Sequence, residues 1–202
     1  MDIIALQERK KYNTLWENCA AYREFAPADV LTPIFLDFFH KQIKDGENVI
    51  DFGCGTGRSV PFLLAKKLHV NLVDFCDNCM DPEIFFLTLG SPPLVHFFQE
   101  CLWSLSPSVK PAEWILCFDV LEHIPEEKVD DVLKAISSRM QKGGLISICL
   151  CEDDFGSIVG ERLHLTIKPA SWWREKINRY FSIFSEFGPS KNTLLLALSN
   201  LV

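Results

Sequence analysis

The sequence has little positive charge, because 20 lysine and arginine residues stand against 27 aspartate and glutamate residues and give a formal net charge of −7. An acidic chain has no general electrostatic attraction to a phosphate backbone, which disfavours nucleic acid as a partner. The chain also lacks an apolar run of the roughly 18 residues that a membrane-spanning helix requires. We therefore expect neither a membrane span nor a broad basic surface.

No targeting segment is recognisable at the start of the chain, since no sustained apolar region precedes the first charged residues. Eight cysteines are present, and several fall on predicted strands, where a reduced cysteine behaves as a small apolar side chain. Cys76 and Cys79 have the spacing of a redox or metal pair, but no second pair accompanies them. We expect a cytoplasmic protein with reduced cysteines, and the sequence does not indicate its oligomeric state.

The stretch from Val49 to Gly57 is the most informative feature, because an apolar strand runs into a glycine loop with Asp51 at the junction. The P-loop requires Gly-Lys-Ser/Thr, which is missing, and the dinucleotide pattern requires its third glycine where Arg58 stands. A carboxylate two residues before the first glycine repels a pyrophosphate but suits a ligand with an ammonium and a sulfonium group. The loop therefore predicts S-adenosylmethionine as the cofactor.

Four segments in order resemble the class I S-adenosylmethionine-dependent methyltransferases, in the branch that modifies small molecules and lipids. They are Asp51–Gly57, Val70–Asp74, Ile115–Pro125 and Lys142–Ile148. The second segment ends in an acid about 20 residues after the glycine loop, where a carboxylate can accept both ribose hydroxyls. The resemblance extends through most of the chain and implies a methyltransferase with this cofactor.

The resemblance implies cofactor contacts from the glycine loop, from the chain after the second, third and fourth strands, and from one arginine. These candidates are Asp51, Gly53, Cys54, Gly55, Gly57, Asp74, Phe75, Cys101, Leu102, Asp119, Val120 and Arg23. Arg23 would pair with the cofactor carboxylate, unless it is a solvated surface residue. After the third strand the chain departs from the family pattern of an acid followed by an apolar residue facing the adenine. Either Glu100 takes the part of that acid or a backbone amide near Leu102 acts alone.

Apolar segments alternate with helical stretches, and this alternation predicts a parallel sheet with right-handed crossovers. The predicted strands lie near 48–53, 69–75, 94–99, 113–118 and 144–151, and the clearest helix at 126–140. A helix at 169–179 precedes two apolar runs, 180–187 and 193–199, that predict a hairpin with its turn at 188–192.

We expect an α/β fold, a Rossmann-like doubly wound sheet preceded by N-terminal helices, in a single domain over 1–202. Residues 1–45 would form a helical cap of two helices, and 46–202 the cofactor-binding core with its C-terminal hairpin. The resemblance adds a seven-stranded sheet whose last strand is antiparallel, between the fifth and sixth. It also implies that the cap covers the cofactor cleft, whereas the alternative is that it completes the core.

Two histidines are candidates for a general base, because an imidazole titrates near working pH. His123 follows the fourth strand and His164 follows the fifth, and each has the alternative of a structural role. The aromatic residues Tyr22, Trp172 and Trp173 are candidates for the substrate wall, with core packing as the alternative for the tryptophans. We expect Glu152–Asp154 to be a solvated acidic loop, and we predict no metal site.

The sequence thus predicts an S-adenosylmethionine-dependent methyltransferase that acts on a small molecule, on a hydroxyl of a sugar, glycan precursor or other metabolite. One alternative is methylation of RNA or of a protein side chain. Another is a non-catalytic binding module that kept the fold. The intact glycine loop, Asp51 and Asp74 argue against that module.

Overall fold

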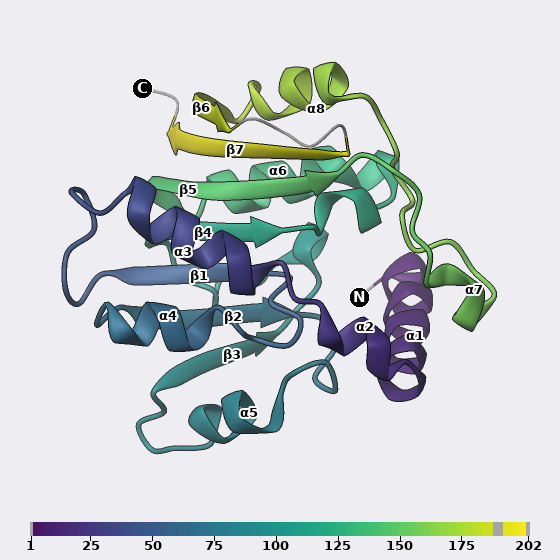
Figure 1. The fold of residues 1–202 in the computed structure, drawn as a ribbon, viewed down its shortest axis with the longest axis horizontal. Helices are drawn as coiled ribbons and strands as arrows, with labels where there is room; N and C mark the ends of the chain where they lie inside the picture. Colours follow the sequence, from purple (N-terminus) through teal and green to yellow (C-terminus); the bar gives the residue numbers. More distant parts are fainter. Residues whose placement is uncertain (1, 188–191, 201–202) are drawn as a thin grey trace.

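The computed structural model describes residues 2–187 and 192–200 of the 202-residue chain. Seven strands form one sheet in the order β3-β2-β1-β4-β5-β7-β6 (Figure 1). The strands are β1 Asn48–Phe52, β2 His69–Asp74, β3 Val95–Gln99, β4 Ala112–Phe118, β5 Met140–Cys149, β6 Phe181–Phe187 and β7 Thr193–Asn200. β1 to β5 are parallel, and β7 is antiparallel to both of its neighbours. The predicted fold is therefore confirmed, including the position of the last strand.

Helices cover both faces of the sheet, because inward and outward side chains alternate along each buried strand. One face packs against α6 and α8, and the other against α3, α4 and α5. The helices are α1 Ile3–Asn18, α2 Ala20–Glu24, α3 Ala28–Phe38, α4 Val60–Ala65, α5 Pro82–Thr88, α6 Val129–Ser137, α7 Gly156–Val159 and α8 Ala170–Ile177. This layering leaves the carboxyl ends of the strands as the edge where a ligand can enter.

The N-terminal region differs from the prediction, since it forms three helices instead of two. These helices pack against different parts of the molecule. Phe35 of α3 and Phe39 just after it pack against Trp114 of β4, so this helix completes the core. α1 lies instead beyond the carboxyl ends of the strands, beside α7 (Figure 1). α3 thus fits the alternative that the predicted cap completes the core, whereas α1 lies at the edge of the sheet where the cofactor cleft is expected.

The fifth strand also begins earlier than predicted, at Met140 rather than near residue 144. Gly143 and Gly144 both lie inside β5. A Cβ on Gly143 would lie 2.7 Å from the carbonyl oxygen of Leu198, and one on Gly144 would clash with that of Ile115. The pair is thus required by close backbone contacts with β7 and β4. The predicted turn at 188–192 lies, except for Asn192, outside the described residues.

Candidate functional site

A cavity of about 290 Å³ opens at the carboxyl ends of β1, β2 and β4, beneath α1. Most of the residues selected from the sequence line it: Tyr22, Asp51, Gly53, Cys54, Gly55, Asp74, Phe75, Leu102, Asp119, Val120, His123 and His164. Glu100, the alternative acid after β3, lines it as well. Its size is near the lower end of the range of about 300–1,000 Å³ that is typical of small-molecule sites.

The glycine loop after β1 presents bare backbone to this cavity at Gly55. The residue has a φ of +51°, and an added Cβ would meet only the Trp16 ring, at 3.7 Å. Gly57 also has a positive φ, of +76°, but a Cβ there would lie 2.7 Å from Ile84 of α5. Gly55 is therefore the position where a ligand can approach the backbone, whereas Gly57 is required by packing within the protein.

Asp74 is fixed at the end of β2 by two backbone amides. Its Oδ2 accepts a hydrogen bond from the N–H of Gly55 at 3.0 Å, and its Oδ1 accepts one from the N–H of Cys76 at 2.9 Å. Burial raises the pKa of this carboxyl to about 6, and these amides oppose the rise. Each oxygen keeps a second lone pair, so the carboxylate is oriented to accept hydrogen bonds from a ligand in the cavity.

Asp51 supplies a second buried carboxyl to the cavity wall. The hydroxyl of Ser59 donates a hydrogen bond to its Oδ2 at 2.5 Å. Burial raises the pKa of Asp51 to about 6, and the nearby Asp74 adds to the rise. Two adjacent acids without a cationic partner among the described residues suit a positively charged ligand, because it would stabilise their ionised forms. The residues present therefore fit a sulfonium and ammonium compound such as S-adenosylmethionine.

We predict that Asp51→Asn stabilises the unliganded protein by about 2–3 kcal/mol at pH 8 and by about half as much at pH 5. The folded-state pKa of Asp51 is raised, so its contribution to stability is largest at low pH and is lost as the pH rises through about 6. Urea unfolding at both pH values measures this difference. The exposed Asp77→Asn is the control and should have no such pH dependence, and an equal effect of Asp51→Asn at both pH values would contradict the expectation.

Asp119 marks the end of β4 with a left-handed backbone, at a φ of +51°. Its N–H donates to the carbonyl oxygen of Ser147 at 3.1 Å and to the Ser147 hydroxyl oxygen at 3.0 Å. The hydroxyl of Ser147 in turn donates to Oδ1 of Asp119 at 2.5 Å. Burial raises the pKa of Asp119, and the Ser147 hydrogen bond opposes it. These contacts fix the turn that directs Val120, His123 and the adjacent Glu122 toward the cavity.

The two candidate histidines lie together, with ring centroids 4.6 Å apart. Nδ1 of His123 is 2.5 Å from the Tyr12 hydroxyl, and Nδ1 of His164 is 2.5 Å from the carbonyl oxygen of Cys151. Burial and, to a smaller extent, the nearby His164 lower the pKa of His123 to about 3. His123 is therefore neutral and a weak base at working pH, which leaves His164 as the better placed of the two for moving a proton.

Three aromatic or charged candidates lie elsewhere. Trp173 is fully buried in the core, and Trp172 packs on it beside Lys168 and Lys176, so neither lines the cavity. The guanidinium of Arg23 donates to backbone carbonyls of Trp16, Asn78 and Cys79.

These positions correct two expectations. The tryptophan pair forms no substrate wall, and Arg23 connects α2 to the chain after β2 instead of facing a cofactor carboxylate. Gly57 and Cys101 also lie outside the set of residues that line the cavity.

Several cavity residues were not selected from the sequence. They are mainly aromatic side chains of the N-terminal helices and residues after β4 and β5: Tyr12, Trp16, Phe25, Glu122, Cys149, Asp153 and Phe155. Tyr12 and Trp16 are four residues apart on one face of α1, which is the signal that favours a shared contact surface. Glu122, in contrast, gives no sequence signal that distinguishes it from a solvated acid.

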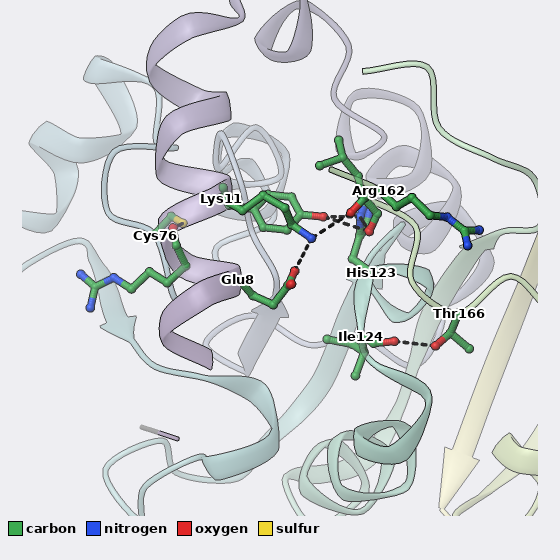
Figure 2. Close-up of polar contacts among 10 residues, drawn as sticks. Glu8, Lys11, Cys76, His123, Ile124, Arg162 and Thr166 are labelled. Atoms are coloured by element: carbon green, nitrogen blue, oxygen red, sulfur yellow. Dashed lines mark hydrogen bonds and ion pairs between the residues drawn. The ribbon is translucent and has the colours of Figure 1, made fainter. Parts of the chain in front are cut away.

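The first helix is attached over the cavity by an internal polar network (Figure 2). Lys11 has a side chain that is only 1% exposed, and its Nζ lies 2.5 Å from Oε2 of Glu8. The same Nζ donates to the carbonyl oxygen of Arg162 at 2.9 Å. Figure 2 shows this side chain extending from α1 toward the segment that contains Arg162, next to His123. The buried lysine thus joins α1 to the chain that follows β5.

We expect Lys11→Ala to loosen this cover without unfolding the sheet, because it removes both contacts and leaves the Glu8 carboxylate without its partner. Amide hydrogen exchange in α1 should become at least about tenfold faster, whereas exchange in β1 and β4 stays unchanged. Lys10→Ala, on the neighbouring position, is the control. Equal protection of α1 in wild type and in Lys11→Ala would show that the network does not hold the helix.

Comparison with protein families matches residues 22–187 to a family described as a methyltransferase domain. A comparison with curated proteins found no significant match. Within residues 2–187 and 192–200, no helix combines the length and apolar character needed to cross a membrane.

Solved structures share the fold at low identity. The magnesium protoporphyrin IX methyltransferase of Synechocystis PCC 6803 with bound SAH has a TM-score of 0.64 at 17% identity, over 86% of this chain and 81% of that one. The 1,6-didemethyltoxoflavin-N1-methyltransferase of Burkholderia thailandensis has a TM-score of 0.65 at 18% identity, over 96% and 84%. The N-methyltransferase NodS of Bradyrhizobium japonicum WM9 has a TM-score of 0.64 at 12% identity, over 96% and 98%.

Proposed function

Because this chain belongs to the class I S-adenosylmethionine-dependent methyltransferases, we propose that it transfers the methyl group to a small molecule held beneath α1. The cofactor supplies a methyl carbon that is activated by a positively charged sulfur. The protein therefore has to align an acceptor with that carbon, exclude water and accept a proton where the acceptor carries one. Each of these tasks corresponds to residues of the cavity.

Cofactor binding falls to the part of the cavity formed by β1 and β2. We assign the close approach to the Gly55 backbone, the ribose hydroxyls to Asp74, and the positive charge of the ligand to Asp51. Asp119 and Val120 complete this side of the wall at the end of β4. Glu100 is less suited to take the part of the adenine-facing acid, because Oε1 already accepts two hydrogen bonds, from the Ser106 and Ser108 hydroxyls, and Oε2 accepts one from the N–H of Ser106.

The enclosure under α1 is the observation that carries the proposal of a small acceptor. Aromatic rings from α1, α2 and the chain after β5 surround the remaining part of the cavity: Tyr12, Trp16, Tyr22 and Phe155. Such rings offer flat apolar contact area to a compact molecule. Two of the structurally similar proteins are named after small-molecule acceptors, magnesium protoporphyrin IX and 1,6-didemethyltoxoflavin, which supports the same proposal.

We assign proton removal to His164, with a hydroxyl of a sugar, glycan precursor or other metabolite as the acceptor group. His164 lines the cavity, and its Nδ1 is held by the carbonyl oxygen of Cys151, which can only accept a hydrogen bond. The neutral ring therefore keeps its lone pair on Nε2, where it can take a proton. His123 and Tyr12 orient this ring from the side of α1.

Transfer of labelled methyl groups into fractionated extract tests this function. The protein is incubated with methyl-labelled S-adenosylmethionine and, separately, with metabolites of low molecular mass, total RNA and total protein. We expect label only in the metabolite fraction, and none with an Asp74→Ala control. Label in RNA or protein would replace the proposed acceptor class, and no label in any fraction, with cofactor binding intact, would favour a non-catalytic module.

A further inference from the structure

Three side chains of the cavity wall bring together an oxygen, a sulfur and a nitrogen that can bind a metal. Glu122, Cys149 and His164 each place one such atom so that all three lie within 4.8 Å of one another. They come from the turn after β4, the end of β5 and the loop before α8, so the fold, not a local motif, assembles them. The cluster is distinct from the acidic loop Glu152–Asp154 that the sequence drew attention to.

Glu122 is the strongest sign that this cluster has a further partner. Its side chain is fully buried, and Oε1 accepts a hydrogen bond from the N–H of Cys149 at 2.8 Å. Oε2 is buried too and has no hydrogen-bond partner among the described residues. An unpartnered buried carboxylate oxygen costs free energy unless a proton or a cation compensates it.

His164 has the orientation that metal-binding histidines have. Its Nδ1 donates to the carbonyl oxygen of Cys151, at 2.5 Å, because that oxygen can only accept. Metal-ligating histidines commonly donate one ring N–H to a backbone carbonyl in this way, which fixes the tautomer and leaves the other nitrogen for the metal. The residues present thus supply both a ligand and the contact that orients it.

From this geometry we propose that Glu122, Cys149 and His164 form a zinc-binding site whose fourth position faces the cavity. Nitrogen and sulfur ligands favour zinc over magnesium or calcium, which take oxygen ligands. An ionised Glu122, a thiolate and a neutral imidazole together balance the charge of Zn²⁺. Tetrahedral ligands at zinc lie about 3.3–3.8 Å apart, so the three atoms need to close by at most about 1.5 Å.

A metal at this position would change how the proposed function removes the proton, because Nε2 of His164 cannot bind zinc and accept a proton at the same time. The metal would then take the place of His164 in activating the acceptor. The three ligands line the same cavity as the acceptor, so the open position would receive a hydroxyl or thiol group of the acceptor. Coordination to zinc makes such a group more acidic. The site itself does not depend on that role, because metal binding can be measured without methyl transfer.

Cobalt is the appropriate probe, since Co²⁺ takes zinc sites and a thiolate ligand gives it a charge-transfer band in the near ultraviolet. Protein stripped with a chelator is titrated with Co²⁺ under reducing conditions. We expect the band to appear at one equivalent and to disappear when Zn²⁺ is added, because zinc binds such sites more tightly. No band in the wild-type protein would overturn the proposal.

Single substitutions identify the ligands. Cys149→Ser should abolish the band, and Glu122→Gln and His164→Gln should weaken Co²⁺ binding by more than about 100-fold, beyond the usual effect of an outer-shell change. Cys151→Ser is the matched control, because its sulfur lies 3.3 Å from that of Cys149 and is similarly exposed but belongs to no ligand set here.

The proposal is judged from Co²⁺ binding in all of these variants together. Circular dichroism confirms that each variant is folded, and if the buried Glu122→Gln does not fold, Cys149→Ser and His164→Gln carry the test. Loss of the band in Cys151→Ser with retention in Cys149→Ser would contradict the assignment. Unchanged affinity in His164→Gln would contradict it as well.

Discussion

Replacing Gly55 by arginine is expected to abolish binding of S-adenosylmethionine. The Gly55 backbone faces the cavity, and an added Cβ there meets only the Trp16 ring, at 3.7 Å. An arginine side chain would therefore extend into the space that the adenosyl group needs, and its positive charge would repel a ligand that is itself cationic there. Calorimetric titration should show micromolar binding to the wild-type protein and no binding to Gly55→Arg at millimolar cofactor.

The matched control for this change is Gly46→Arg. Gly46 also has a left-handed backbone, at a φ of +80°, but it is exposed, with nothing within 4 Å of an added Cβ. It carries the same conformational strain away from the cavity, so cofactor affinity should stay within about twofold of wild type. Wild-type affinity in Gly55→Arg would show that the glycine loop does not hold the cofactor.

Replacing Asp74 by alanine is expected to weaken cofactor binding by about 100-fold. Two hydrogen bonds to a charged acceptor contribute about 1.5 kcal/mol each, and together they account for a factor of this size. The change also frees the N–H of Gly55, which donates to Asp74 in the unliganded protein. Calorimetry at pH 8, where the raised pKa of about 6 leaves Asp74 ionised, measures the loss.

Asp77→Ala is the control for this second change. Asp77 lies three residues later and is exposed, so its removal alters the local charge without touching the cavity. Both proteins should unfold cooperatively at similar denaturant concentrations. If Asp74→Ala binds within threefold of wild type, the ribose is held elsewhere and the assignment of Asp74 is wrong.

The sequence was sufficient for the part of the site that local motifs determine. The glycine loop and Asp74 each follow a buried strand, and parallel strands bring their carboxyl ends to one edge, so the sequence order predicted their proximity. The same reasoning located Asp119 and His123 after β4. The hairpin was predicted because its two apolar runs are short and adjacent, and its antiparallel insertion came from the family resemblance.

Contacts between segments that are distant in the sequence could not be predicted from local motifs. Tyr12 meets His123 across 111 residues of chain, and no local pattern indicates that pairing. Arg23 was predicted to face the cofactor, and in the structure three of its five N–H groups donate to backbone carbonyls. Trp172 and Trp173 were predicted to form a substrate wall. In the structure Trp173 lies in the core on one face of the sheet, and Trp172 packs against that core. Glu122 shows the reverse case, a charged residue whose complete burial only the fold reveals.

The central claim is that the Gly55 backbone and the Asp74 carboxylate together hold the adenosyl part of the cofactor. A crystal structure of the protein with S-adenosylhomocysteine tests it most directly. We expect the adenosine to lie against Gly55, with both ribose hydroxyls within hydrogen-bond distance of Asp74. Ligand density outside this cavity, or a ribose without a hydrogen bond to Asp74, would contradict the account.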